Sequence, residues 1–229
     1  MSHLVDLMQD IAAQEAVRPL TTELAVVTAV HPHADEGDKD NYGCTVTLKN
    51  RMTADGKPIE LKQVPVAVPY IGMTCIPNVD DLVIVQFLGG DAHAPVITHR
   101  LYNDTDRPPV NLENEFQLRH KLEAGGTLKI DTEGVITLTS KSEENIVTVN
   151  DDQVSIANEN MSLIVDFSGE TISLTSTKDI TLKADGNVAI EGKEIALKSE
   201  AAMKIEAGSS MDIKSSAAMK VEGATIDLN

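Results

Sequence analysis

The stretch that decides the fold is residues 195–221, which read IALKSEAAMKIEAGSSMDIKSSAAMKV. An apolar pair separated by one residue recurs in it every eight residues, with first members at Ile195, Met203, Met211 and Met219. Alternation at period two places both apolar residues on one face of a short β-strand. Small and polar residues fill the intervals, as is typical of turns. The repeat therefore predicts a stack of short strands, each with one apolar face.

The pair pattern begins far upstream, at residue 128, and continues in steps of seven to nine residues apart from one longer gap. A repeat of eight residues cannot enclose its own core, because a single-chain β-helix needs roughly 20 or more residues per coil. No aromatic residue follows Phe167, so the core must be slender. Three identical chains winding around one axis meet these conditions. Each chain then adds a strand to each face in turn, and strand edges pair between chains.

Residues 128–229 are therefore predicted to form an intertwined triple-stranded β-helix, a needle built by a homotrimer. Because a lone chain would leave its strands without partners, we expect trimer formation to be obligatory. The repeated methionines are expected to fill the core, since soft-metal sites usually bring converging Cys or His ligands. The predicted trimer core consists of Ile172, Leu174, Ile180, Leu182, Val188, Ile190, Ile195, Leu197, Met203, Ile205, Met211, Ile213, Met219 and Val221.

Residues 21–103 show a different pattern, with β-rich runs separated by polar loops. Asp55-Gly56 is a turn signal, and Gly89-Gly90-Asp91 predicts a hairpin. Five short antiparallel strands in a domain of this size are typical of a small OB-type barrel. The predicted strands are 24–30, 42–48, 64–68, 82–87 and 96–101.

Two further segments complete an all-β chain with one short helix. Residues 104–127 are predicted to be a linker, because Pro108-Pro109 favours extended backbone and Gly125-Gly126 is flexible. Residues 1–20 are predicted to form a helix that ends before Pro19. Its apolar stripe either packs on its own domain or docks onto a neighbouring hub subunit, and the two alternatives stay open. The stripe consists of Leu4, Leu7, Met8 and Ile11.

Composition excludes several classes of partner. The sequence carries 19 Lys and Arg against 36 Asp and Glu, a formal net charge of -17 at pH 7. Such a surface repels phosphate backbones and anionic lipids, so nucleic acid is not an expected partner. No apolar run is long enough for a bilayer span, and residues 1–10 are acidic rather than basic. Neither a transmembrane segment nor a signal peptide is expected.

Candidate reactive groups do not form a known catalytic or metal-binding pattern. His31-Pro32-His33 lies in a polar loop. Asp80-Asp81 and Asp151-Asp152 are adjacent acids in turns, where two carboxyl groups rarely have the different environments that separate the pKa values of a catalytic pair. No P-loop or nucleophile elbow is present. We therefore expect no enzyme activity, no catalytic or metal-ligating residues and no cofactor, with ions on the trimer axis left open. Cys44 and Cys75 are expected to be buried free thiols, a disulfide being the less favoured alternative.

An OB-type barrel also raises the alternative of single-stranded nucleic-acid binding. That function uses stacking aromatic residues in a basic groove. The barrel segment offers few aromatic residues on an acidic background. Phe87 and Tyr102 are expected either in its core or in another structural role. His93 and His99 are expected at the surface or in hydrogen bonds between subunits.

Residues 80–103, DDLVIVQFLGGDAHAPVITHRLYN, resemble the end of the OB domain in contractile-tail spike proteins, the family of phage baseplate assembly protein V and the C-terminal half of VgrG. His99 departs from this pattern, because the family often has Gly there. Arg119-His120-Lys121 and the strands that follow it, up to Ser140, resemble the start of the family's needle. The resemblance covers about residues 20–229. It implies a trimeric structural spike at the centre of a baseplate, driven through the target cell envelope by sheath contraction.

The resemblance also implies partners and a location. The chain looks like the short, phage-tail type of spike, which docks on a separate hub protein. Some short spikes end in a His-x-His iron site, but no His follows His120 here. We instead expect a PAAR-type tip protein to dock on Ile226, Asp227, Leu228 and Asn229. The expected location is a virion or injection-system baseplate assembled in the bacterial cytoplasm, with phage, bacteriocin and extracellular injection system all open. The alternative function is a tail-associated adhesin or a carbohydrate-active β-helix protein.

Overall fold

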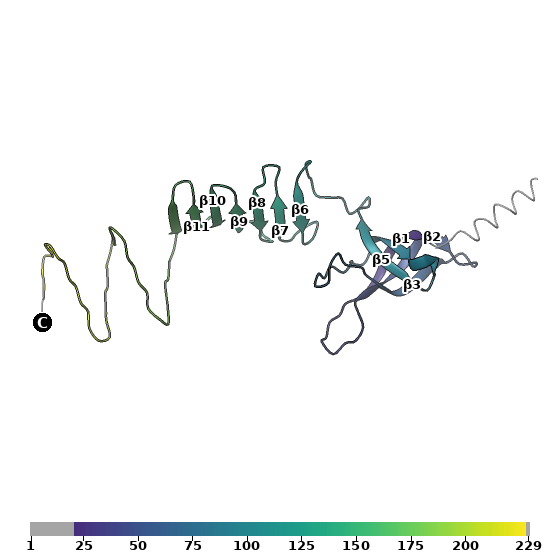
Figure 1. Cartoon of the computed structure of the whole chain (residues 1–229), viewed down its shortest axis with the longest axis horizontal. Helices are drawn as coiled ribbons and strands as arrows, with labels where there is room; N and C mark the ends of the chain where they lie inside the picture. The colour runs from purple at the N-terminus through teal and green to yellow at the C-terminus, as the bar shows by residue number, and fades with distance from the viewer. Residues whose placement is uncertain (1–20, 228–229) are drawn as a thin grey trace, which may run out of the picture. The chain divides into compact units, whose positions relative to one another are not determined.

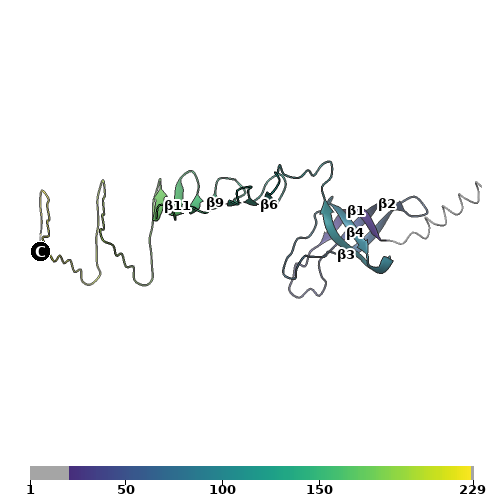
Figure 2. The ribbon, with the colours of Figure 1, turned by 45° about the horizontal axis from the view of Figure 1, so that its top comes forward.

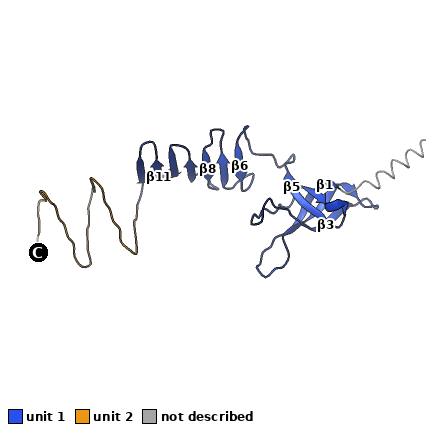
Figure 3. Cartoon of the chain, viewed as in Figure 1, with its two compact units in different colours: residues 1–179 blue, residues 180–229 orange. Residues whose placement is uncertain are grey.

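The computed structural model describes residues 21–227, which divide between two compact units, 1–179 and 180–229 (Figure 3). The helix predicted over 1–20, with its stripe of Leu4, Leu7, Met8 and Ile11, lies outside the described residues. So do Leu228 and Asn229. Among the described residues no helix is long and apolar enough to cross a membrane.

The first sheet is a five-stranded antiparallel barrel (Figure 1). Its order is β3-β2-β1-β4-β5. A parallel bridge between Val66 and Ile97, with a hydrogen bond from the Ala67 N–H to the Ile97 carbonyl at 2.8 Å, joins the end of β3 to β5. This closure gives the strand order of an OB-type barrel, as the sequence predicted. The strands are β1 (Thr22–His31), β2 (Gly43–Met52), β3 (Pro58–Pro65), β4 (Leu82–Phe87) and β5 (Pro95–Leu101).

Small aliphatic residues fill the barrel, as the shortage of aromatic residues required. Val27, Val46, Val64 and Val85 have no exposed surface, and Phe87 is the one aromatic residue of the buried core. A short 3₁₀ turn, η1 (Leu88–Gly90), joins β4 to β5 where the Gly-Gly-Asp hairpin was predicted. Gly89 has φ 64°, a left-handed conformation that favours glycine.

One barrel strand differs from its predicted position. The sequence predicted a strand over 64–68, whereas β3 begins at Pro58 and ends at Pro65. Its alternating residues Ile59 and Leu61 pack against the core, which extends the strand towards its N-terminus. The β3–β2 register contains irregularities, so the alternation along β3 is interrupted, and simple period-two counting missed its start.

The second sheet is a seven-stranded antiparallel meander (Figure 1). Each strand pairs with its neighbours in sequence, in the order β12-β11-β10-β9-β8-β7-β6. Polar turns connect the strands; for example, the Asp131 carboxylate accepts hydrogen bonds from the backbone of Glu133 and Val135. The strands are β6 (Phe116–Arg119), β7 (Thr127–Ile130), β8 (Ile136–Thr139), β9 (Ile146–Val149), β10 (Gln153–Ala157), β11 (Met161–Asp166) and β12 (Thr171–Ser176).

This meander corrects two expectations. The segment 104–127, expected to be a linker, contains β6. The strands of residues 128–176 were expected to pair between chains, but each of them pairs within its own chain. The connections are short enough for consecutive strands to fold back as hairpins, so a single chain satisfies their backbone hydrogen bonds.

The second unit, over its described residues 180–227, has extended backbone without assigned strands. The in-chain backbone hydrogen bonds of the described residues end at Thr177, whose N–H donates to the Asn160 carbonyl. Successive windings of this segment do not lie side by side in either Figure 1 or Figure 2. Within residues 180–227 the backbone groups therefore form no backbone–backbone hydrogen bonds; two of them pair with nearby serine side chains instead, the Ala202 carbonyl with Ser199 and the Ala217 N–H with Ser215.

Candidate functional site

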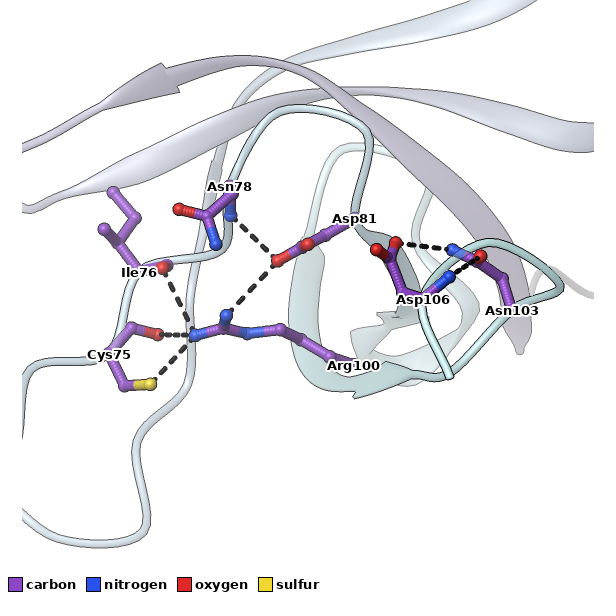
Figure 4. Close-up of polar contacts among 7 residues, drawn as sticks. All are labelled: Cys75, Ile76, Asn78, Asp81, Arg100, Asn103 and Asp106. Carbon is purple, nitrogen blue, oxygen red and sulfur yellow. Dashed lines mark hydrogen bonds and ion pairs between the residues drawn. The ribbon is translucent and has the colours of Figure 1, made fainter. Parts of the chain in front are cut away.

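An arginine at the end of the barrel holds the segment that leads into β4 (Figure 4). Arg100, on β5, donates to the Asp81 carboxylate at 3.2 Å and to the carbonyl oxygens of Cys75 and Ile76 at 2.9 and 3.2 Å. The same carboxylate accepts a hydrogen bond from the Asn78 N–H at 2.8 Å. Every part of this cluster is used in fixing a loop, so we interpret it as a structural clamp.

The chain leaves the barrel through a second polar turn (Figure 4). The Asn103 side-chain oxygen accepts from the N–H groups of Thr105 and Asp106, both at 2.7 Å, and its amide nitrogen donates to the Asp106 carboxylate at 3.0 Å. Beyond this turn, the Lys129 ammonium lies 2.7 Å from the Glu115 carboxylate and, together with the Leu112 N–H, lowers the pKa of Glu115. These contacts fix local turns before the meander.

The histidines and acids considered as reactive groups make local contacts in strands and turns. His31 Nε2 lies 2.9 Å from the Thr45 hydroxyl, and His33 Nδ1 lies 3.0 Å from the Asp40 carbonyl. Asp152 belongs to a turn capped by the Asn150 side chain. Within residues 21–227, no group of three or more His, Cys, Asp and Glu side chains is arranged to hold a metal ion.

The structure decides three residue assignments in the barrel. Tyr102, for which the core was one of two expected positions, is 57% exposed, because it follows β5 and lies past the closed barrel. Phe87 is buried, as predicted. Cys44 is a buried free thiol whose pKa is raised by burial, but Cys75 is exposed, because it lies on the surface segment that Arg100 clamps.

The meander aligns the predicted apolar pairs into two columns. In β7 and β8, Leu128 faces Leu138 and Ile130 faces Ile136. The same register repeats across the sheet, ending with Leu163 opposite Leu174 and Val165 opposite Ile172. Because side chains alternate between the two faces of a strand, both columns lie on one face. The columns are Phe116, Ile130, Ile136, Val149, Val154, Val165 and Ile172, and Leu118, Leu128, Leu138, Val147, Ile156, Leu163 and Leu174.

This apolar face is left partly uncovered by the chain itself. Leu138 is 47% exposed and Leu174 is 53% exposed, whereas equivalent aliphatic residues inside the barrel are fully buried. The opposite face carries mainly polar residues, such as Lys129, Thr137 and Thr148. A sheet with one apolar face needs a surface to cover it.

The second unit, taken by itself, also carries apolar pairs that are exposed. Of its predicted core residues, Met211 is the least exposed at 45%, and Leu182 is among the most exposed at 76%. Ile226, in the expected tip-docking segment, is half exposed, and Asp227 is also exposed. The predicted trimer-core residues are thus exposed in both units. We take the exposed apolar pairs of each unit as the candidate interaction surface and call them its apolar strip.

Sequence reasoning missed the two earliest members of the meander columns, Phe116 and Leu118. They form the same apolar pair as the later repeats, but they lie in the segment expected to be a linker. Their spacing was the available signal, and the flanking Pro and Gly residues obscured it.

A comparison with known protein families matches part of this chain. Residues 61–102 match the Type VI secretion system/phage-baseplate injector OB domain. The matched segment begins within β3 and includes β4, η1, β5 and the Arg100 clamp. The closed five-stranded barrel on which it lies agrees with an OB domain. The barrel is therefore similar to the OB domain of baseplate injector proteins, which supports a structural, spike-related role at a baseplate.

Proposed function

We propose that this chain is the central spike of a contractile-tail or injection-system baseplate, acting as a homotrimeric needle without enzymatic turnover. The observation that carries the proposal is the pair of apolar columns, which one chain builds in register and does not cover. The injector OB match supports the baseplate location. Sheath contraction would drive the needle through the envelope of the target cell.

A threefold assembly would cover the apolar face of the meander. Three copies of residues 116–176 can meet with their apolar faces inward and form a three-sided prism, because each copy already satisfies its own strand hydrogen bonds. Burying a Val, Leu or Ile side chain fully contributes about 1.5–3 kcal/mol. The partly exposed columns would therefore contribute a gross term on the order of ten kcal/mol per chain, before conformational entropy is subtracted.

The second unit needs partners for a further reason. Unpaired backbone N–H and C=O groups next to an apolar surface lose hydrogen bonds when that surface is buried. Residues 180–227 have no in-chain strand partners in the described structure, so burial of their apolar strip requires strands from other chains. An intertwined triple-stranded β-helix supplies such strands, and we retain it for this segment.

The mechanical role follows from strand stacking. Strands that lie across the needle axis stack about 4.8 Å apart through continuous hydrogen-bonded ladders. Such a rod resists bending and leaves few open strand edges along its length. A hub protein would bind the N-terminal part of the chain, and a PAAR-type tip protein would cover the part that includes Ile226 and Asp227.

The test is the mass and shape of the purified full-length chain. Multi-angle light scattering should give three times the chain mass of 24.6 kDa, and negative-stain images should show slender needles. A monodisperse, folded monomer would refute the proposal. A glycan array tests the alternative function. Binding or cleavage of a glycan would favour an adhesin or a carbohydrate-active protein over a structural needle.

Tip docking is tested separately. A variant lacking residues 219–229 should still form trimers but lose copurification of a coexpressed PAAR-type protein, since the docking surface is removed. A full-length variant carrying Ile226→Asp removes only the apolar contact of Ile226 with the tip protein and is the matched variant. Equal retention of the tip protein by all three chains would contradict this part of the proposal.

A further inference from the structure

The repeats of the second unit carry an alternating charge directly after each apolar pair. The residue at this fourth position is lysine and glutamate in turn through six successive repeats. The alternation continues across the step from Val188 to Ile195, where the repeat is seven residues long instead of eight. The charge therefore keeps its position relative to the apolar pair rather than a fixed spacing along the sequence. The series is Lys183, Glu191, Lys198, Glu206, Lys214 and Glu222.

A second alternating series lies at the residue between the two apolar positions. In the last four repeats this residue is lysine and aspartate in turn. Each of these repeats therefore has either Lys-x-Glu or Asp-x-Lys as its charged pattern, except that the last fourth-position residue is asparagine. The second series is Lys204, Asp212, Lys220 and Asp227.

Both series lie on the face opposite the apolar strip. The Lys204 ammonium is 2.5 Å from the Glu206 carboxylate, and Lys220 is equally close to Glu222. Residues two apart share one face of an extended strand, so these contacts place the second and fourth positions together. The side chains of all four residues are 69–80% exposed. In a trimer with the apolar strip inside, the charges would lie on the outer surface.

Threefold symmetry determines which repeats become neighbours there. If each chain adds one strand to each face in turn, a given face receives repeat 1 from one chain, repeat 2 from the second and repeat 3 from the third. All strands on that face run in the same direction, since the three chains wind in the same sense. Neighbouring strands therefore belong to successive repeats of different chains. At the fourth position, Lys198 and Lys214 each lie between two glutamates, and Lys183, which opens the series, lies beside one.

The direction of pairing decides whether the fourth-position alternation has any effect. In the antiparallel meander, Val165 pairs with Ile172, and the fourth-position Asp166 faces Thr171, which precedes the next apolar pair. Antiparallel pairing thus separates the fourth positions of successive repeats. Parallel pairing brings them side by side at about 4.8 Å, where opposite charges attract and like charges repel. The alternation at this position favours parallel neighbours.

We propose that the Lys/Glu series of residues 183–222 is an interchain charge ladder that sets the axial register of the three chains. The inference rests on the proposed trimer. Apolar packing alone tolerates a slip of one repeat, because successive repeats present nearly the same apolar pair. A slip of one repeat places lysine beside lysine and glutamate beside glutamate, so the ladder disfavours it. The strand that pairs with each free strand edge of this segment belongs to another copy of this chain. Equivalent residues of the three copies then lie at the same height along the trimer axis.

A ladder-inverted chain tests the proposal. It reverses every sign in both series, leaves the net charge unchanged and preserves the in-strand pairs. Wild-type and inverted chains with different tags are unfolded together, refolded at low salt and examined by native mass spectrometry. Two differently tagged wild-type chains are the control and should mix statistically. The inverted chain carries K183E, E191K, K198E, K204D, E206K, D212K, K214E, K220D, E222K and D227K.

The expected result is two populations of homotrimers with at least tenfold fewer mixed trimers than in the control. Mixed trimers should return when refolding is done near 1 M salt, where screening shortens to about 3 Å. Statistical mixing at low salt would overturn the proposal. An inverted chain that fails to form trimers would also overturn it, because alternation is restored in that chain. Monomeric wild-type protein would instead refute the proposed function itself.

A single substitution gives a second test. Lys214→Glu places three acids in succession on the ladder, whereas Lys193→Glu makes the same change in charge between repeats and off the ladder. The first should lower the melting temperature of the trimer at low salt by several degrees more than the second. Equal effects of the two variants would contradict the ladder.

Discussion

Ile213→Ala provides the sharpest test of whether the apolar strip is buried between chains. Ile213 is 70% exposed in the single chain, so its own chain covers less than a third of it. Residues 180–227 supply no in-chain strand partner that would cover the rest. The effect of truncating this side chain therefore depends almost wholly on other copies.

The expected loss of stability depends on how much of the Ile213 side chain other copies cover. Removing a large aliphatic side chain from a packed core typically costs about 2–5 kcal/mol, so three copies at one level of a trimer would cost roughly 6–15 kcal/mol per trimer. In a lone chain the covered fraction is small, and the loss would stay below about 1 kcal/mol. The two cases differ by far more than the error of an unfolding measurement.

The assay is guanidinium unfolding of the full-length protein, followed by circular dichroism at several protein concentrations. Coupled dissociation makes the unfolding midpoint of a trimer depend on concentration. Val110→Ala is the matched control, because Val110 is 95% exposed and lies outside the repeats. We expect Ile213→Ala to lower the midpoint strongly and Val110→Ala to leave it unchanged. Equal, small effects and no concentration dependence would refute the reasoning.

Three further predictions concern the barrel and the turns. Arg100→Met removes the donors of the clamp and should lower the free energy of unfolding of the barrel by about 1–3 kcal/mol. The control Lys62→Met breaks an exposed ion pair and should change this free energy by less than about 1 kcal/mol. Similar losses for both variants in denaturant titrations would contradict the clamp. A thiol reagent should modify Cys75 in the native protein and Cys44 only after unfolding, since burial raises the pKa of Cys44; two labels on native protein by mass spectrometry would count against this. The backbone N–H of Gly169 lowers the pKa of Asp166, so the carboxylate stabilises its turn fully above pH 3.8 and loses this effect as pH falls through the lower folded-state pKa; a carbon-detected NMR titration of Asp166 with its midpoint above 3.8 would show the opposite.

The sequence predicted the barrel because its strands carry strong local signals. Alternating Val, Ile and Thr residues mark the strands, and Gly89-Gly90 marks the turn between β4 and β5. The start of β3 was missed, because register irregularities opposite β2 interrupt its alternation. The Arg100 clamp has no local signal, since it joins residues about twenty positions apart that only the closed barrel brings together.

Sequence periodicity by itself determined which residues of the repeats share a face, because alternation along a strand is a property of the local backbone. It could not determine which strand edges meet, because hydrogen bonds in a sheet join residues that no local rule connects. Only the tertiary structure placed the strands of 116–176 beside one another within one chain and left 180–227 without such partners. The physical reason is that edge pairing depends on how the turns direct the chain, whereas the apolar pattern is the same for either arrangement.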